Sequence, residues 1–237
     1  MRRIFAFLVI LVLCALSEQL FCQEKKGLEY DIISEAGIDA VIYRGPVYVK
    51  YPFRFSGTFY AYSPNFGTGS VYYNNKEYNN VKINLNSHRD ELHLQMYGAG
   101  LIIVLEKSYV ERFSYGGCNF TNHTEGDGIV GLQPGYYQVL YSGEIKLFKR
   151  IEQLITEKLG VDSRGMSTLK EFSPRYTYFL IKDGEAVQIK KRGDIIKNYK
   201  PMKGQIKQFV RENQLNLADK SENDKVFGRM IEFIDNK

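Results

Sequence analysis

The sequence of 237 residues contains no tryptophan, only three cysteines and only three histidines. Two of the cysteines, Cys14 and Cys22, belong to an N-terminal segment that we expect to be removed. The third, Cys118, then has no partner, which excludes an internal disulfide. The fold must therefore be held together by packing. Apart from residues 4–16 the chain has no long apolar run, so no second membrane segment is expected.

The N-terminal segment has the layout of a secretory signal peptide. Arg2 and Arg3 precede the apolar run of residues 4–16, which is too short for the ~30 Å hydrocarbon core that requires about 20 apolar residues. We expect cleavage after Cys22, so that the signal peptide spans residues 1–22. Two alternatives stay open, an uncleaved membrane anchor and a lipid on Cys22, although the residues before Cys22 are not the small ones that usually precede a lipid-modified cysteine.

Export of the protein restricts its possible compartment and partners. Removing residues 1–22 from the 237 leaves 215 residues, and the net charge falls from +5 to +4 because two arginines and one glutamate leave. This length suits one large domain or two small ones. An exported chain without disulfides is more typical of a bacterial envelope than of an animal extracellular space. We therefore expect the periplasm or outer envelope of a Gram-negative bacterium, where nucleic acid is excluded as a partner.

Composition and pattern both favour β structure. The 18 tyrosines and 15 phenylalanines favour pleated, half-buried positions. Apolar and polar residues alternate over residues 81–86 and 91–96, which predicts strands with one face on the core and one in water, as antiparallel sheets allow. The continuous apolar run at residues 101–105 predicts a strand that is buried on both faces.

Two short polar sequences predict tight hairpins. Asn74 and Asn75 lie between two strand-like segments, and their side chains tolerate positive φ. Asp183-Gly184, in the middle of residues 176–190, is a preferred pair for a primed turn. Connections this short make the neighbouring strands antiparallel.

Residues 145–159 fit two periods. Leu147 and Ile151 alternate as in a strand, whereas Leu154 and Leu159 complete a pattern of 3.6 residues. We expect a hairpin strand as far as Arg150 that continues into a helix.

After Tyr199 the sequence pattern changes from strand-like to helical. Two segments there carry apolar side chains on one helical face and charged side chains on the others. These two faces consist of Met202, Ile206, Phe209 and Val210, and of Val226, Phe227, Met230, Ile231 and Ile234. Pro201 suits a first helical turn, and Ser221 suits an N-cap. We expect two amphipathic helices that pack on the β part.

Together these patterns predict a mainly β (α+β) fold, an antiparallel β sandwich or partly open barrel with two C-terminal amphipathic helices. The expected organisation is a signal peptide at residues 1–22, an antiparallel β domain at residues 23–198 and a helical cap at residues 199–237.

The densest group of reactive side chains lies in the Gly-rich stretch 116–135, which we expect to be irregular. Cys118, His123, Glu125 and Asp127 offer thiolate, imidazole and carboxylate groups that bind metals. No paired spacing such as C-x-x-C accompanies them, so the metal hypothesis is weakly supported. A nucleophilic Cys118 with His123 as its base is the enzymatic alternative, and it requires an orienting group and an oxyanion site.

The remaining histidines and one carboxylate pair carry less information. His88 and His93 are five residues apart, which on a strand places them on opposite faces, so they cannot share a metal without a bend. We expect His93 to be a solvated residue on the polar face of its strand. Asp90 and Glu91 are adjacent and would also point apart, unlike the facing carboxylates of a glycosidase.

Known catalytic motifs are missing. Gly126, Gly128 and Gly131 match G-x-G-x-x-G by letter, but a polar loop precedes them and Pro134 follows where a phosphate-binding helix should begin. We therefore assign no catalytic residue and no cofactor, and we leave a metal site undetermined.

Residues 182–211 are basic, with nine lysines and arginines against three acids. Because export excludes nucleic acid, the functional interpretation is contact with anionic lipid or glycan headgroups. The simpler interpretation, which we prefer, is a solvated hairpin and helix face.

Four segments of the chain carry a family resemblance: the cleavage region at residues 20–23, Gly69–Tyr78 followed by Asp90–Leu92, Gly135–Tyr141 and Ile206–Phe209. In these segments the chain resembles the uncharacterised exported tyrosine-rich β proteins of Bacteroidota. It implies an exported protein with an antiparallel β region and a helical pair, and it implies no catalytic residue.

The expected function is that of an exported cell-envelope protein with a non-catalytic β domain that binds a ligand or a partner. Its many tyrosines offer flat amphipathic contact surfaces. The expected partners are an apolar ligand, a glycan or another envelope protein, and any membrane contact is through the signal peptide or peripheral. The alternative is an envelope hydrolase or metal-dependent enzyme that uses the Cys118–Asp127 loop.

Overall fold

The computed structural model describes residues 40–96, 98, 100–162, 165–215 and 223–237. The expected signal peptide and the expected N-cap at Ser221 lie outside these residues. In the described part the protein is mainly β, with one large sheet. No helix of the described part is long and apolar enough to cross a membrane.

The elements follow the chain in a simple order. The strands are β1 (Phe55–Ser56), β2 (Gly67–Tyr73), β3 (Lys76–Asn86), β4 (Glu91–Gln95), β5 (Ile102–Val104), β6 (Val110–Tyr115), β7 (Cys118–His123), β8 (Gly135–Ser142), β9 (Lys146–Asp162), β10 (Gly165–Lys182) and β11 (Glu185–Ile189). The helices are α2 (Arg192–Asn198), α3 (Lys203–Glu212) and α4 (Asn223–Asp235), and the short 3-10 turns are η2 (Val41–Tyr43), η3 (Lys107–Tyr109), η4 (Glu125–Asp127) and η5 (Lys200–Met202).

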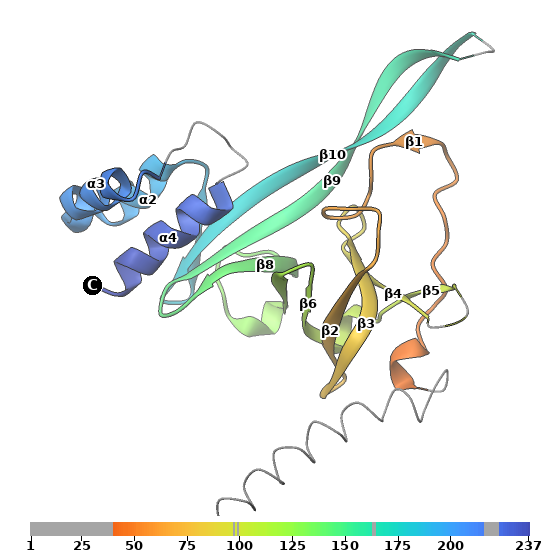
Figure 1. The fold of residues 1–237 in the computed structure, drawn as a ribbon, viewed down its shortest axis with the longest axis horizontal. Coiled ribbons are helices and arrows are strands. Elements are labelled where there is room, and N and C mark those ends of the chain that lie inside the picture. Colours follow the sequence, from red (N-terminus) through yellow and green to blue (C-terminus); the bar gives the residue numbers. More distant parts are fainter. Residues whose placement is uncertain (1–39, 97, 99, 163–164, 216–222) are drawn as a thin grey trace, which may run out of the picture.

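All eleven strands belong to one sheet that does not close. Their order is β1-β10-β9-β8-β7-β6-β2-β3-β4-β5, and β11 pairs with the end of β10. The pairs are antiparallel except for the short parallel contact of β1 with β10. This arrangement, with α3 and α4 as the C-terminal helices, confirms the predicted fold class, and α2 is an additional short helix (Figure 1).

Both predicted hairpins are present. Asn74 and Asn75 connect β2 to β3 at φ 50° and 60°. Asp183 and Gly184 connect β10 to β11 at φ 52° and 78°. These left-handed backbone conformations are the ones that asparagine, aspartate and glycine adopt at low cost.

The apolar side chains form three clusters. The first lies within β2, β3, β4, β6 and β7 and includes Phe113 and Phe120. The second lies between one face of β9 and β10 and the helices, where Leu147 and Leu180 contact Phe227 and its neighbours. The third lies on the opposite face, where the loop residue Leu132 covers Phe148. Figure 1 shows the three helices gathered on one side of the long β9–β10 hairpin.

The expectation of a helix after Arg150 was wrong. Residues 146–162 form one strand that pairs with β10 along its whole length. Leu147 and Ile151 are buried at strand spacing, whereas Leu159, which had completed the helical pattern, is 78% exposed. Backbone pairing with β10 therefore decides the conformation. Beyond the contact of β1 with Lys170 and Glu171, the hairpin extends away from the rest of the sheet as an arm (Figure 1).

The expected solvated face of β3 and β4 is in fact covered. His93 is 0% exposed, because residues 48–66 pass over this face and place Tyr48 and Tyr60 against its ring. Asn84, its cross-strand neighbour, donates to the carbonyl oxygens of Ser63 and Asn65 at 2.8 and 3.0 Å. Asn84, Asn86 and His93 are thus buried beneath a covering segment, whereas Lys82 and Gln95 on the same face stay exposed.

The run at residues 101–105 forms the expected strand, β5, but it is not buried on both faces. Ile103 and Leu105 are buried, while Leu101 is exposed and Ile102 and Val104 are partly exposed. Ile102 and Val104 lie on a face that is partly open to solvent, although residues 46–48 form hydrogen bonds along the outer edge of β5.

Candidate functional site

The stretch 116–135 is more regular than expected. Its first half forms strand β7, which pairs with β6 and β8. This strand places Cys118 and His123 at its two ends, about 17 Å apart at 3.4 Å per residue, and on opposite faces because five residues separate them. A Cys118–His123 nucleophile pair therefore does not form. Among the described residues there is no group of three histidine, cysteine, aspartate or glutamate side chains that could hold a metal.

His123 and Asp127 do meet. The Nδ1 atom of His123 lies 3.0 Å from Oδ2 of Asp127, and Asp127 also accepts hydrogen bonds from the backbone N–H and the hydroxyl of Thr124 at 2.9 and 3.0 Å. Burial alone would raise the pKa of Asp127, but the bonds from Thr124 and the contact with His123 outweigh it and lower this pKa. Glu125 is exposed in η4 and takes no part.

The His123–Asp127 pair lines a surface cavity of about 390 Å³. The cavity is polar on most sides, and its other charged or hydroxyl-bearing lining residues are Thr121, Glu144, Lys146, Lys182 and Asp183. Nε2 of His123 has no hydrogen-bond partner among the described residues. The carboxylate of Asp127 therefore fixes Nδ1 of His123, while Nε2 makes no hydrogen bond within the described part of the chain.

A second polar site lies between the first and second apolar clusters, on the face of the sheet that carries the helices. We call it the Lys149 cluster, and it consists of Tyr62, Cys118, Gln138, Lys149, Tyr176, Tyr178 and Asp224. Strand pairing builds it, because Lys149 of β9 lies opposite Gln138 of β8 and Tyr178 of β10. The helix α4 completes it with Asp224 from its first turn.

Lys149 is the centre of this cluster and is almost fully buried, with 5% of its side chain exposed. Its ammonium group donates to Oδ2 of Asp224 at 2.7 Å and lies 3.4 Å from the hydroxyl of Tyr62. The hydroxyl of Tyr178 donates to the other oxygen of Asp224 at 2.8 Å. A buried ammonium requires such a paired carboxylate, because an unpaired charge in the interior is strongly unfavourable.

Two tyrosine rings lie beside the ammonium group and are partly open to solvent. Nζ of Lys149 lies 4.2 Å from the ring centre of Tyr176 and 5.3 Å from that of Tyr62. Tyr62 is 42% exposed and Tyr176 is 44% exposed. The hydroxyl of Tyr62 also donates to Oε1 of Gln138. The cluster thus presents two aromatic faces beside a group of fixed donors and acceptors.

Cys118 belongs to the Lys149 cluster rather than to the loop chemistry predicted for it. Burial raises the pKa of its thiol; the nearby Asp224 raises it further, and Lys149 lowers it without reversing the shift. A thiol with a raised pKa stays protonated near neutral pH and is a poor nucleophile.

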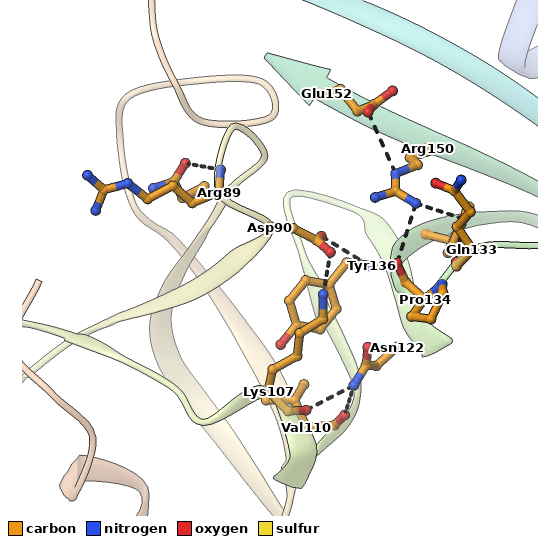
Figure 2. Close-up of polar contacts among 12 residues, drawn as sticks. Arg89, Asp90, Lys107, Val110, Asn122, Gln133, Pro134, Tyr136, Arg150 and Glu152 are labelled. Carbon is orange, nitrogen blue, oxygen red and sulfur yellow. Dashed lines mark hydrogen bonds and ion pairs between the residues drawn. The ribbon is translucent and has the colours of Figure 1, made fainter. Parts of the chain in front are cut away.

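Asp90 and Glu91 point to different partners, as expected for adjacent residues. Asp90 has a left-handed backbone at φ 57° and accepts a hydrogen bond from the N–H of Tyr136 at 3.1 Å. It also forms an ion pair with Lys107, whose Nζ lies 4.8 Å from the Tyr136 ring centre (Figure 2). Glu91 instead lies 3.2 Å from Nε2 of His93. The Asp90 contacts join the β3–β4 turn to β8 and are structural.

The surroundings of Asp90 are closely packed. A Cβ atom added to Gly135 would lie 2.8 Å from Oδ2 of Asp90 and 3.3 Å from Cζ of Arg150, so only glycine fits there. Arg150 in turn donates to the carbonyl oxygen of Pro134 at 3.4 Å and pairs with Glu152 at 3.9 Å (Figure 2). Burial lowers the pKa of the neighbouring His93, and its contact with Glu91 only partly offsets this.

Sequence reasoning missed the Lys149 cluster. Its residues come from six separate segments of the chain, and Lys149 lies in the segment whose period was ambiguous. The available signal was a lysine at an inward strand position, between Leu147 and Ile151. Compared with known proteins, the chain matches no family model, no curated protein and no solved structure.

Proposed function

We propose that the protein is an exported cell-envelope protein of a Gram-negative bacterium that binds a glycan at the Lys149 cluster without catalysing a reaction. The observation that carries the proposal is the pair of half-exposed tyrosine rings, Tyr62 and Tyr176, beside a buried ammonium group that is paired with Asp224. A sugar ring has an apolar C–H face and a rim of hydroxyl groups. Flat aromatic rings bind the apolar face, and polar groups at their exposed rim, such as the hydroxyl of Tyr176, bind the hydroxyl groups of the sugar.

The chemistry of the cluster supports binding over catalysis. The thiol of Cys118 is held protonated, and the charge of Lys149 is engaged by Asp224. An apolar ligand has less support, because charged or polar side chains line every described cavity. A protein partner stays an outcome of the test below.

Replacing both exposed tyrosines should abolish most glycan binding. We expect the full chain to sediment with purified peptidoglycan sacculi or to bind immobilised polysaccharide from lipopolysaccharide. In the Tyr62→Ala/Tyr176→Ala variant the affinity should fall about tenfold or more, since an aromatic contact is worth about 0.5–1.5 kcal/mol. Tyr109→Ala, which removes another half-exposed tyrosine far from the cluster, should bind like the wild type. Absence of binding to both glycans, or equal losses in both variants, would contradict the proposal.

The His123–Asp127 pair favours a second candidate, an envelope hydrolase. A carboxylate that holds Nδ1–H leaves Nε2 free to act as a general base toward a ligand in the 390 Å³ cavity. In this case His123→Ala should reduce hydrolysis of a panel of ester and amide substrates by at least 100-fold, within the range of about 10²–10⁴ for general-base catalysis. Cys118→Ser should have no effect, because Cys118 lies on the other face of β7. A detected activity that survives His123→Ala would eliminate this site.

A further inference from the structure

The positive charge of the protein is concentrated in one short part of the fold. Residues 190–215, which include α2 and α3, carry eight lysines and arginines against two acids, a net charge of +6, while the whole chain carries +5. The rest of the sequence is therefore close to neutral. A charge asymmetry of this size marks a surface that attracts an anionic partner.

Helix α3 arranges part of this charge as a stripe. Lys203, Lys207 and Arg211 are spaced four residues apart, so they follow one side of the helix, and all three are exposed. Ile206 and Val210 lie next to this stripe on the buried side of the helix, in the second apolar cluster. The core thus covers the apolar side of α3, and the basic side remains to attract an anionic surface through its charge.

A cavity of about 650 Å³ lies between α2 and α3 beside this stripe. Arg192 of α2 and Lys207 and Arg211 of α3 supply its cations. None of the three forms an ion pair within the described part of the chain. Its apolar wall consists of Ile196, Val210 and Leu215.

We propose that this cavity, the α2–α3 groove, binds the phosphate headgroup of an anionic lipid and holds the protein against a membrane surface. Guanidinium groups such as those of Arg192 and Arg211 bind phosphate with two parallel hydrogen bonds, and Lys207 adds a point charge. The apolar wall suits the glycerol and the first methylene groups of the lipid. This inference is independent of the glycan proposal, because it uses no residue of the Lys149 cluster.

The test measures sedimentation of the full chain with vesicles of phosphatidylcholine alone and with vesicles that contain 30% phosphatidylglycerol. The wild type should prefer the anionic vesicles, and the preference should weaken in high salt. Lys207→Glu/Arg211→Glu should lower the affinity at least 30-fold, since a cation near an anionic membrane contributes about 1 kcal/mol and reversal adds repulsion. Arg192→Gln, from the other helix, should lower it about fivefold.

A matched control distinguishes binding at the α2–α3 groove from a general effect of the protein's net charge. Lys76→Glu/Lys82→Glu makes the same change in net charge on two exposed lysines of β3, and it should bind within about threefold of the wild type because these residues lie outside the α2–α3 groove. Equal losses in the two double variants, or no preference of the wild type for anionic vesicles, would overturn the proposal. So would displacement of the protein by millimolar inorganic phosphate at constant ionic strength, because the groove would then be a site for small anions.

Discussion

Truncation of the chain after Tyr199 is expected to give an unfolded or insoluble protein. The deletion removes Ile206, Val210, Val226, Phe227, Met230, Ile231 and Ile234, all buried in the second apolar cluster. Burying each such side chain contributes about 1.5–3 kcal/mol before entropy is counted, whereas a domain is stable by only about 5–15 kcal/mol. Circular dichroism and a thermal melt of the soluble fraction measure the result.

The same truncation removes a polar connection. Asp235 near the end of α4 accepts hydrogen bonds from the hydroxyl of Tyr141 and the N–H of Ile145, both at 2.9 Å. A control that ends at Asp235 keeps this residue and the buried face of α4, so it should melt like the full chain. If the chain of residues 1–199 stays soluble with an unchanged melting temperature, then the helices form an independent unit and the assigned core is wrong.

Replacing Asp224 by alanine is expected to destabilise the protein by about 3 kcal/mol, the lower end of the range for breaking a buried ion pair. The estimate is at the lower end because about a third of the Asp224 side chain is exposed, and solvent can partly compensate. The change leaves the ammonium group of Lys149 buried without its carboxylate and also removes the acceptor of Tyr178. Urea denaturation of the variant measures the loss.

Two further variants make this test specific. Lys149→Met combined with Asp224→Ala should recover most of the stability, because an apolar side chain of similar length removes the buried charge. Glu77→Ala, which removes an exposed carboxylate of β3, should change the free energy of unfolding by less than about 0.5 kcal/mol. If the double variant is as unstable as Asp224→Ala, then the buried charge of Lys149 does not cause the loss of stability.

Local patterns predicted the parts of the fold that depend on neighbours in sequence. The turns at Asn74-Asn75 and Asp183-Gly184 need positive φ, and these residue types are the ones that adopt positive φ most readily. The apolar face of α4 recurs at helical spacing, so its burial followed from the sequence. These features require only residues a few positions apart.

The predictions that failed depend on segments far apart in sequence. The part of β9 after Arg150 was expected to be a helix, and this was wrong because pairing with β10 decides its conformation. His93 was expected in water because nothing in β4 reveals that residues 48–66 cover it. In both cases contacts with a distant segment override the structure that the local pattern of apolar and polar residues predicts.

The candidate site was even less accessible to sequence reasoning. The pair considered as the enzymatic alternative, Cys118 with His123, is divided by the alternation of a strand in a stretch that was expected to be irregular. The Lys149 cluster contains no motif, since its residues converge only after β8, β9, β10 and α4 have assembled. Such a site is defined by tertiary structure alone.

Native mass spectrometry of the protein purified from a bacterial envelope tests the central claim, glycan binding at the Lys149 cluster, most directly. The account predicts a bound species with a carbohydrate mass on the wild type and on Tyr109→Ala, and its absence from Tyr62→Ala/Tyr176→Ala. A carbohydrate adduct that persists in the Tyr62→Ala/Tyr176→Ala variant, or a wild-type protein that carries no ligand and turns over a substrate in a His123-dependent reaction, would contradict it.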